Sequence, residues 1–360
     1  MDNLAHTLVG AALGRAVAAR RVPAAAWIGA IAANAPDWSE FLIGFRPERG
    51  TSAYYTMHRG ITHSFAGAVI ETVAIAAVAW GLVSLWRRKH GIAVSPAWIV
   101  ALVGATVLSH LYMDWQGSYG LRPFLPWSGH WYYADWVAIV DPLYWLIPLV
   151  ALAWGAERHW RDLIPLVLLA ALISVLLVIR ANDVAPWLLV GSFAVLAIGA
   201  VGWVDHWFGV VRRGRAGAWA IALLAAYAGA QGIASRGAKA DAQRVAVARF
   251  GSRAQSAALT RIGTPFQWSP ILASADSVAG PGWAIPRHLN DPWVRRALSE
   301  SPNGRAFGDF ARFLAAEVDS APSGVTVTLR DARYALPPET GWGVITVEFA
   351  TSASRGVAPD

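Results

Sequence analysis

The sequence contains no cysteine, and it is poor in charged residues. Without cysteine there are no disulfide bonds, no thiolate zinc sites and no cysteine nucleophile. Charged residues make up only 15% of the 360 residues, whereas soluble domains typically contain about 25%. Hydrophobic residues reach 56%, and the mean hydropathy is +0.40. This composition disfavours both a wholly soluble globular protein and a disordered chain, and it indicates a membrane protein.

The net charge of +7 and the isoelectric point near 10 would also suit a protein that binds nucleic acid. However, the arginines gather in short loops between apolar runs, which is typical of membrane topology and not of a nucleic-acid-binding stripe. We therefore expect the lipid bilayer, and no nucleic acid, as a partner. The 20 tryptophans agree with this, because tryptophan is enriched at the level of the lipid headgroups.

Several apolar runs approach the roughly 20 residues that a helix needs to cross a bilayer. They are Phe65–Trp86, Ala97–Leu111, Val137–Trp154, Leu163–Ile179, Trp187–Val204 and Ala216–Ala234. Two shorter segments, Leu4–Ala19 and Ala24–Asn34, predict a helical hairpin that is either tightly packed or re-entrant. The predicted fold is a polytopic α-helical membrane protein with about six to eight transmembrane helices and a C-terminal soluble α+β domain.

The character of the chain changes near Ser235, so we predict a helical membrane domain over residues 1–234 and a soluble α+β domain over residues 235–360. In the second domain, Gly324–Arg330 and Gly343–Phe349 alternate like β-strands. Asn303–Val318 carries aromatic residues at helical spacing and predicts a helix.

Loop charge predicts an orientation. If the spans alternate, the turns richest in arginine fall on one side, which the positive-inside rule makes cytoplasmic. These turns contain Arg15, Arg20, Arg21, Arg87, Arg88, Lys89, Arg158, Arg161, Arg212, Arg213 and Arg215. The N-terminus and the domain after Ser235 are then expected on the extracytoplasmic side. This bias nearly vanishes if the first hairpin does not cross the membrane.

The most informative polar residues are histidines and aspartates at the ends of apolar segments, all at the same end if the spans alternate. They are His6, Asp37, His58, His63, His110 and Asp114. His110 and Asp114 are four residues apart, which places both on one face of a helix. Four imidazoles and two carboxylates form a nitrogen and oxygen ligand set suited to Zn, Mn or Fe, with one or two ions bound.

Three further residues are candidates for the same site. Arg59, between the two histidines of MHRGITHS, is suited to holding an anionic substrate oxygen. Glu71 is a carboxylate within an apolar run, and such residues are functional candidates by default. Asp141 is either a further metal ligand or the N-cap of a helix, because Asp141-Pro142 is a favourable N-cap pair. Each single histidine has a similar alternative as an interfacial or capping residue.

The motifs HRGITHS, SHLYMDWQGSYGLRPF and VDP resemble those of a bacterial family of membrane-bound metal-dependent hydrolases, which includes the LexA-regulated inner-membrane hydrolase. The resemblance covers about residues 1–145 and implies an inner-membrane protein with a zinc-type site, distantly comparable to zinc-dependent phospholipase C. The positions that match the family motifs are His6, Asp37, His58, Arg59, His63, His110, Asp114 and Asp141. One departure is PDWS, where many relatives read PDxD, so that Ser39 replaces the second acid and Glu40 follows it.

These observations predict a hydrolase in which metal-activated water cleaves an ester or phosphoester of a lipid or a lipid-linked substrate. The alternative is a metal-binding transporter or sensor without hydrolytic activity. Transporters place ionisable groups near the bilayer midplane, whereas here only Glu71 is expected there. A structural scaffold would leave the histidine and aspartate motifs without a role.

Overall fold

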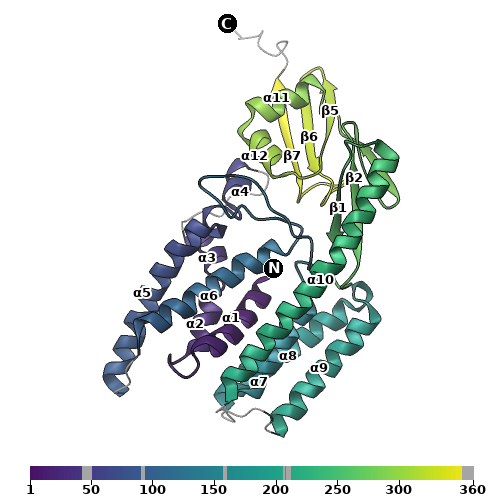
Figure 1. Ribbon diagram of the computed structural model, residues 1–360. Helices are drawn as coiled ribbons and strands as arrows, with labels where there is room; N and C mark the ends of the chain where they lie inside the picture. Colours follow the sequence, from purple (N-terminus) through teal and green to yellow (C-terminus); the bar gives the residue numbers. More distant parts are fainter. Residues whose placement is uncertain (43–50, 91–93, 157–159, 206, 208–211, 351–360) are drawn as a thin grey trace. The chain divides into compact units, whose positions relative to one another are not determined.

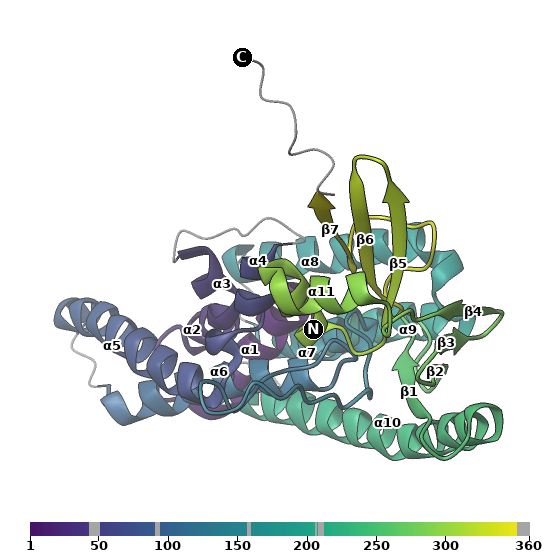
Figure 2. The ribbon, with the colours of Figure 1, turned by 90° about the horizontal axis from the view of Figure 1, so that it is seen from above.

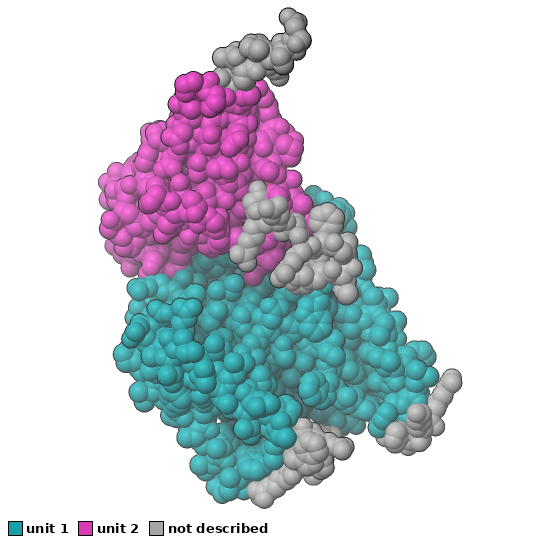
Figure 3. All heavy atoms as spheres, turned by 180° about the vertical axis from the view of Figure 1, so that it is seen from behind, with its two compact units in different colours: residues 1–42, 61–234, 260–267 teal, residues 43–60, 235–259, 268–360 magenta. Residues whose placement is uncertain are grey.

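The computed structural model describes residues 1–42, 51–90, 94–156, 160–205, 207 and 212–350. The chain forms two compact units (Figure 3). Unit 1 contains residues 1–42, 61–234 and 260–267. Unit 2 contains the described parts of residues 43–60, 235–259 and 268–360.

Unit 1 is helical. Its helices are α1 (Asn3–Ala18), α2 (Ala25–Ala32), α3 (Ala35–Leu42), α5 (Phe65–His90), α6 (Pro96–Trp115), α7 (Pro142–Trp154), α8 (Trp160–Ile179), α9 (Pro186–Val204) and the first part of α10 (Arg213–Phe250). Two short 3₁₀ turns, η1 (Ile61–His63) and η2 (Ala181–Asp183), lie between them.

Four helices of the described residues are long and apolar enough to cross a membrane, which confirms the membrane character of this part of the chain. They are Phe65–Trp86, Pro96–Trp115, Pro186–Val204 and Gly214–Phe250. Pro142–Trp154 and Leu163–Ile179 are apolar but shorter. A total of six to eight spans therefore stays a prediction.

Two predicted helix boundaries were wrong. The helix expected from Val137 begins only at Pro142, because the backbone N–H of Val137 instead donates to the Gln116 carbonyl at 3.2 Å. The helix expected to end at Ala234 continues to Phe250, since no proline interrupts this alanine-rich stretch. The boundary expected near Ser235 thus falls inside a continuous helix.

The α1–α2 hairpin is tightly packed, and glycine makes the close approach of its helices possible. A Cβ atom at Gly14 would lie 2.2 Å from the Ala25 carbonyl oxygen, and one at Gly29 would lie 2.2 Å from the Gly10 carbonyl oxygen. Any larger residue would force the two backbones apart. Helices α1, α2 and α5 all pack against α6 (Figures 1 and 2).

The described part of unit 2 contains two sheets, three short helices and the last part of α10, residues 235–250. One sheet has the order β1-β2-β3-β4 and the other the order β5-β6-β7. The strands are β1 (Gln255–Thr260), β2 (Trp268–Ala273), β3 (Ser277–Gly280), β4 (Trp283–Pro286), β5 (Leu314–Ala321), β6 (Gly324–Asp331) and β7 (Val344–Ala350). The helices are α4 (Ser52–Met57), α11 (Pro292–Glu300) and α12 (Pro302–Phe310).

Strands β6 and β7 confirm the two predicted alternations. The helix predicted over Asn303–Val318 was only half right, because α12 ends at Phe310 and Leu314 begins β5. Strand β5 pairs antiparallel with β6 along its whole length, from Leu314 opposite Asp331 to Ala321 opposite Gly324. This hairpin pairing overrides the helical spacing of the aromatic residues.

Helix α4 comes from the N-terminal half of the chain but belongs to unit 2. The Tyr55 ring lies 5.0 Å from the Phe307 ring and 5.1 Å from the Phe310 ring, and the Ser52 N–H donates to Asn303 Oδ1 at 2.7 Å. Conversely, residues 260–267 belong to unit 1. Each unit therefore combines segments that lie far apart in the sequence.

Candidate metal site

The structure brings five of the seven predicted metal ligands together in unit 1. His6 lies on α1, Asp37 on α3, His63 at the end of η1, and His110 with Asp114 on α6. Each of the two groups His6, Asp37, His110 and His63, His110, Asp114 offers ligand atoms within 4.8 Å of one another. We call these five residues the histidine–aspartate cluster.

Five distances among four donor atoms of the cluster are close to those between the ligands of a tetrahedral metal ion. His63 Nε2 lies 3.2 Å from His110 Nε2 and 3.2 Å from Asp37 Oδ1. His110 Nε2 lies 3.7 Å from Asp37 Oδ1, and both Nε2 atoms lie 3.6 Å from Asp114 Oδ2. Ligands about 2.1 Å from a tetrahedral zinc ion are separated by about 3.4 Å. The donor atoms of these residues therefore fit a zinc-type ion.

His6 adds a third imidazole. Its ring stacks on the His110 ring at 3.8 Å, and its Nε2 lies 3.3 Å from Asp114 Oδ1. The Nδ1 atom of His6 is buried and has no hydrogen-bond partner among the described residues. An unsatisfied buried nitrogen is costly, and one ring nitrogen of His6 lies within 4.8 Å of ligand atoms of Asp37 and His110.

Neighbouring groups orient two of the imidazoles. His110 Nδ1 donates to the Ala33 carbonyl at 2.7 Å, so the proton of the neutral ring is on Nδ1 and the Nε2 lone pair faces the cluster. The Thr62 hydroxyl lies 2.9 Å from His63 Nδ1. Metal-binding histidines are commonly held through their second nitrogen in this way.

The cluster is buried, since His6, His63, His110 and Asp114 are each at most 1% exposed. The Met1 amino group contacts the Asp114 carboxylate. Burial lowers the pKa of the His63 imidazole, which favours the neutral form that binds metals. Burial acts to raise the pKa of Asp37, but the hydrogen bond from His63 and the neighbouring imidazoles outweigh it and hold that pKa below its usual range.

Two predicted residues, His58 and Arg59, belong to unit 2. His58 ends α4 and its ring stacks on Tyr54 at 5.2 Å, while the Arg59 side chain is buried. Their roles toward a metal or a substrate stay predictions. Glu71 is half-buried on α5 and is not among the residues that converge in the described part of unit 1.

Asp141 takes the capping position that was the alternative to metal binding. Its Oδ1 accepts a hydrogen bond from the Leu143 N–H at 2.9 Å, and its Oδ2 accepts one from the Tyr227 hydroxyl at 2.6 Å. Among the described residues it is not part of either metal-binding group. Burial raises the pKa of Asp141 to about 6.

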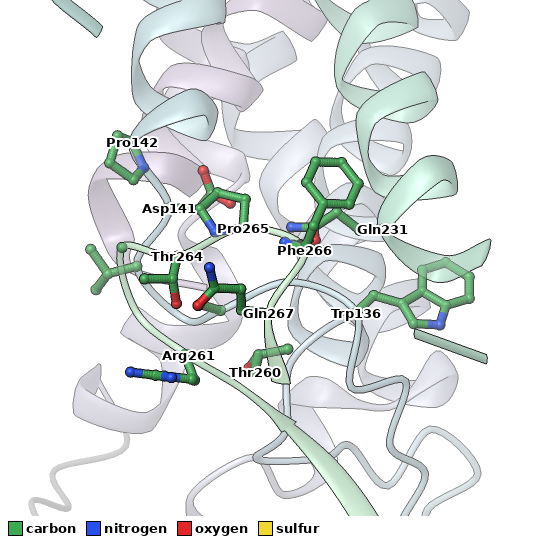
Figure 4. Close-up of a pocket in the computed structure, with 13 residues that line it drawn as sticks. Trp136, Asp141, Pro142, Gln231, Thr260, Arg261, Thr264, Pro265, Phe266 and Gln267 are labelled. Atoms are coloured by element: carbon green, nitrogen blue, oxygen red, sulfur yellow. Dashed lines mark hydrogen bonds between the residues drawn. The ribbon is translucent and has the colours of Figure 1, made fainter. Parts of the chain in front are cut away.

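Asp141 also lines a pocket together with Gln231, Thr264 and Phe266, as Figure 4 shows. The volume of this pocket is only about 10 Å³, which is at most the space of one water molecule. It is therefore too small for a substrate.

Sequence reasoning missed the amides that support the cluster, Asn3 and Asn34. Asn3 Nδ2 donates to Asp37 Oδ2 at 2.8 Å. Asn34 was available as a signal, because it is a polar residue at the end of an apolar segment, three residues before Asp37. Ser39 replaces the second acid of the PDxD motif, and Glu40 follows it. The side chains of both residues lie outside the described residues.

No curated protein and no solved structure matches this chain. A family model does match, and it covers residues 1–185, which is more than half of the chain and includes the whole histidine–aspartate cluster. The match agrees with the predicted inner-membrane location. The chain belongs to the YdjM inner membrane protein family.

Proposed function

We propose that this protein is a membrane-bound metal-dependent hydrolase that cleaves an ester or phosphoester of a lipid or lipid-linked substrate. The observation that carries the proposal is the set of 3.2–3.7 Å separations among His63, His110, Asp37 and Asp114. These four residues would hold one zinc-type ion, and His6 would support it or contribute to a second. Such an ion, when bound, polarises a substrate oxygen and lowers the pKa of water toward neutrality.

The position of the cluster along the candidate spans supports a lipid substrate. Helix α5 begins at Phe65, two residues after His63, and α6 ends at Trp115, one residue after Asp114. The cluster thus occupies the adjacent ends of two candidate spans, where lipid headgroups are concentrated.

An apolar groove between α2 and α5 supports the same substrate class, and we assign it to an acyl chain of that lipid. Its volume of about 460 Å³ is within the usual range for ligand pockets, about 300–1,000 Å³. On α5 it runs from Ile75 to Trp86, so it begins about 15 Å along the helix from Phe65, the end beside His63. On α2 it ends at Ile31, two residues before Ala33, whose carbonyl holds His110.

Metal content and turnover test this proposal. The protein purified in detergent should bind zinc, manganese or iron and hydrolyse at least one member of a panel of phospholipids and phosphodiesters. His110→Ala and Asp114→Ala should lose both properties, whereas His130→Ala should keep them, because His130 is exposed and outside the cluster. Unchanged metal content in both cluster variants would overturn the site, and metal binding without turnover would favour a sensor.

We also propose that the cluster faces the extracytoplasmic side. Helix α5 starts beside His63 and carries Arg87 and Arg88 near its other end, and basic residues favour the cytoplasm. Because the chain has no cysteine, single introduced cysteines report topology directly. In intact spheroplasts an impermeant maleimide should label Ser128→Cys, in the loop after α6, and not Ser95→Cys at the start of α6. The opposite labelling pattern would reverse the orientation.

A further inference from the structure

We infer that Asn3 is a positioning residue: together with Asn34 it forms a hydrogen-bond relay that fixes the orientation of the Asp37 carboxylate toward the metal site. This inference rests on the proposed metal-dependent function, and it adds a residue that neither the sequence motifs nor the ligand geometry identifies.

The relay starts at a group that can only accept a hydrogen bond. Asn34 Nδ2 donates to the Ala30 carbonyl at 2.8 Å, one turn earlier in the chain, and to the Thr7 hydroxyl oxygen at 2.9 Å. The Thr7 hydroxyl in turn donates to the Asn3 carbonyl at 2.7 Å. The carbonyl acceptor fixes which end of the Asn34 amide is nitrogen, so its Oδ1 faces Asn3.

The orientation of the Asn3 amide then follows. Asn3 Nδ2 lies 3.3 Å from Asn34 Oδ1 and 2.8 Å from Asp37 Oδ2. Both of these oxygens are acceptors once Asp37 is ionised, and an amide NH₂ group has two hydrogens to donate. A flipped Asn3 would place oxygen against two oxygens, so a single arrangement satisfies the relay.

As a consequence, the two carboxylate oxygens of Asp37 contact different groups. Oδ2 is occupied by Asn3, which leaves Oδ1 directed at His63 Nε2, 3.2 Å away, and at His110 Nε2, 3.7 Å away. The Asp37 side chain is 21% exposed, whereas that of Asp114 is 2% exposed. Asp37 is thus the more hydrated of the two carboxylates, and an external hydrogen bond is most useful there to limit its rotation.

The relay also connects three elements that the sequence separates. Asn3 and Thr7 lie on α1, Asn34 follows α2, and Asp37 lies on α3. Asn34 is 1% exposed, but Asn3 is exposed. Replacing Asn3 therefore removes the last bond of the relay without opening a cavity, and this makes it the better residue to test.

The test measures zinc affinity of the full-length protein in detergent, by competition with a chromogenic chelator, together with the thermal midpoint of the metal-free protein. Asn3→Ala should weaken zinc binding about tenfold, the low end of the effect known for groups that hold metal ligands. Asn3→Asp, which has similar size but donates no hydrogen bond, should weaken it at least as much. The thermal midpoint of the metal-free protein should stay unchanged in Asn3→Ala, and Asn182→Ala, at an exposed asparagine in η2, should change neither quantity.

A double substitution separates positioning from general stabilisation. In an Asp37→Ala background, Asn3→Ala should change zinc affinity by less than about twofold, because the residue on which it acts is already gone. An unchanged affinity in Asn3→Ala, or the same tenfold loss in the Asp37→Ala background, would overturn the inference while leaving the proposed function intact. A wild-type protein that binds none of zinc, manganese and iron would instead overturn the proposed function, and the relay with it.

Discussion

His63 Nε2 and His110 Nε2 lie 3.2 Å apart, although the neutral His110 ring has its proton on Nδ1, where the Ala33 carbonyl accepts it. The His110 Nε2 lone pair therefore faces His63 and two carboxylates in a buried environment. Electron-rich atoms gathered in this way repel one another unless a cation or extra protons lie among them. The Met1 amino group already contacts the Asp114 carboxylate, and the proposed metal ion or protons on the imidazoles would satisfy the remaining atoms.

Metal removal should lower the stability of the protein. Zinc at about 1,000 times its dissociation constant stabilises the bound state by about 4 kcal/mol, which corresponds to a rise of roughly 10 °C in the thermal midpoint for a domain of this size. We expect that a chelator abolishes this rise in the wild-type protein. Asp114→Asn should have a lower midpoint that zinc and chelator do not change; an equal response of the two proteins in a thermal-shift experiment would contradict this.

The glycine contact of the first hairpin should be essential for the cluster. Gly29→Ala would place a Cβ atom 2.2 Å from the Gly10 carbonyl oxygen, so α1 and α2 must separate, at a cost of about 1–3 kcal/mol. Since α1 carries His6 and α2 leads to Asp37, bound metal should also decrease.

Gly81→Ala is the matched control for this variant, because nothing lies within 4 Å of a Cβ atom at Gly81. It should be neutral or more stable by about 0.5–1 kcal/mol, as expected for alanine in a helix. If both variants have the same thermal midpoint and metal content, the close approach is not required.

Asp141 should make stability depend on pH. Its pKa is raised from 3.8 to about 6 by burial, so between these values the folded state binds more protons than the unfolded state. The free energy of unfolding should therefore fall as the pH rises from about 4 to about 6, by at most about 3 kcal/mol, and then level off. Asp141→Asn should lack this contribution. The measurement is the wild-type minus variant difference in thermal midpoint, which should shrink across this window; a constant difference would argue against it.

Helix α4, from the N-terminal half of the chain, should stabilise unit 2. The Tyr55 ring is 2% exposed and packs against Phe307 and Phe310, so Tyr55→Ala should destabilise this unit by about 3 kcal/mol. Hydrogen exchange of the β5–β7 sheet should then become faster. Thr56→Ala, at the exposed neighbouring side chain, should leave exchange unchanged. Equal exchange in the two variants would show that α4 is dispensable.

Parts of the fold follow from local sequence. Composition and apolar runs identify the membrane helices, because hydrophobic length is a property of a segment by itself. The strands β6 and β7 can also be recognised locally, because their buried and more exposed side chains alternate along the strand. The strand β5 could not be recognised in this way, since Leu314–Ala321 becomes a strand only through pairing with β6.

By itself, the sequence determined which residue types are available for metal chemistry and that they lie at the ends of apolar segments. The tertiary structure alone decided that His6, Asp37, His63, His110 and Asp114 converge, that Asp141 is in neither metal-binding group of the described residues, and that α4 joins unit 2. The physical reason is that ligand distances depend on how closely helices approach and on their rotation about their axes. In this protein those quantities are set by contacts such as Gly29 against Gly10, between residues far apart in the chain.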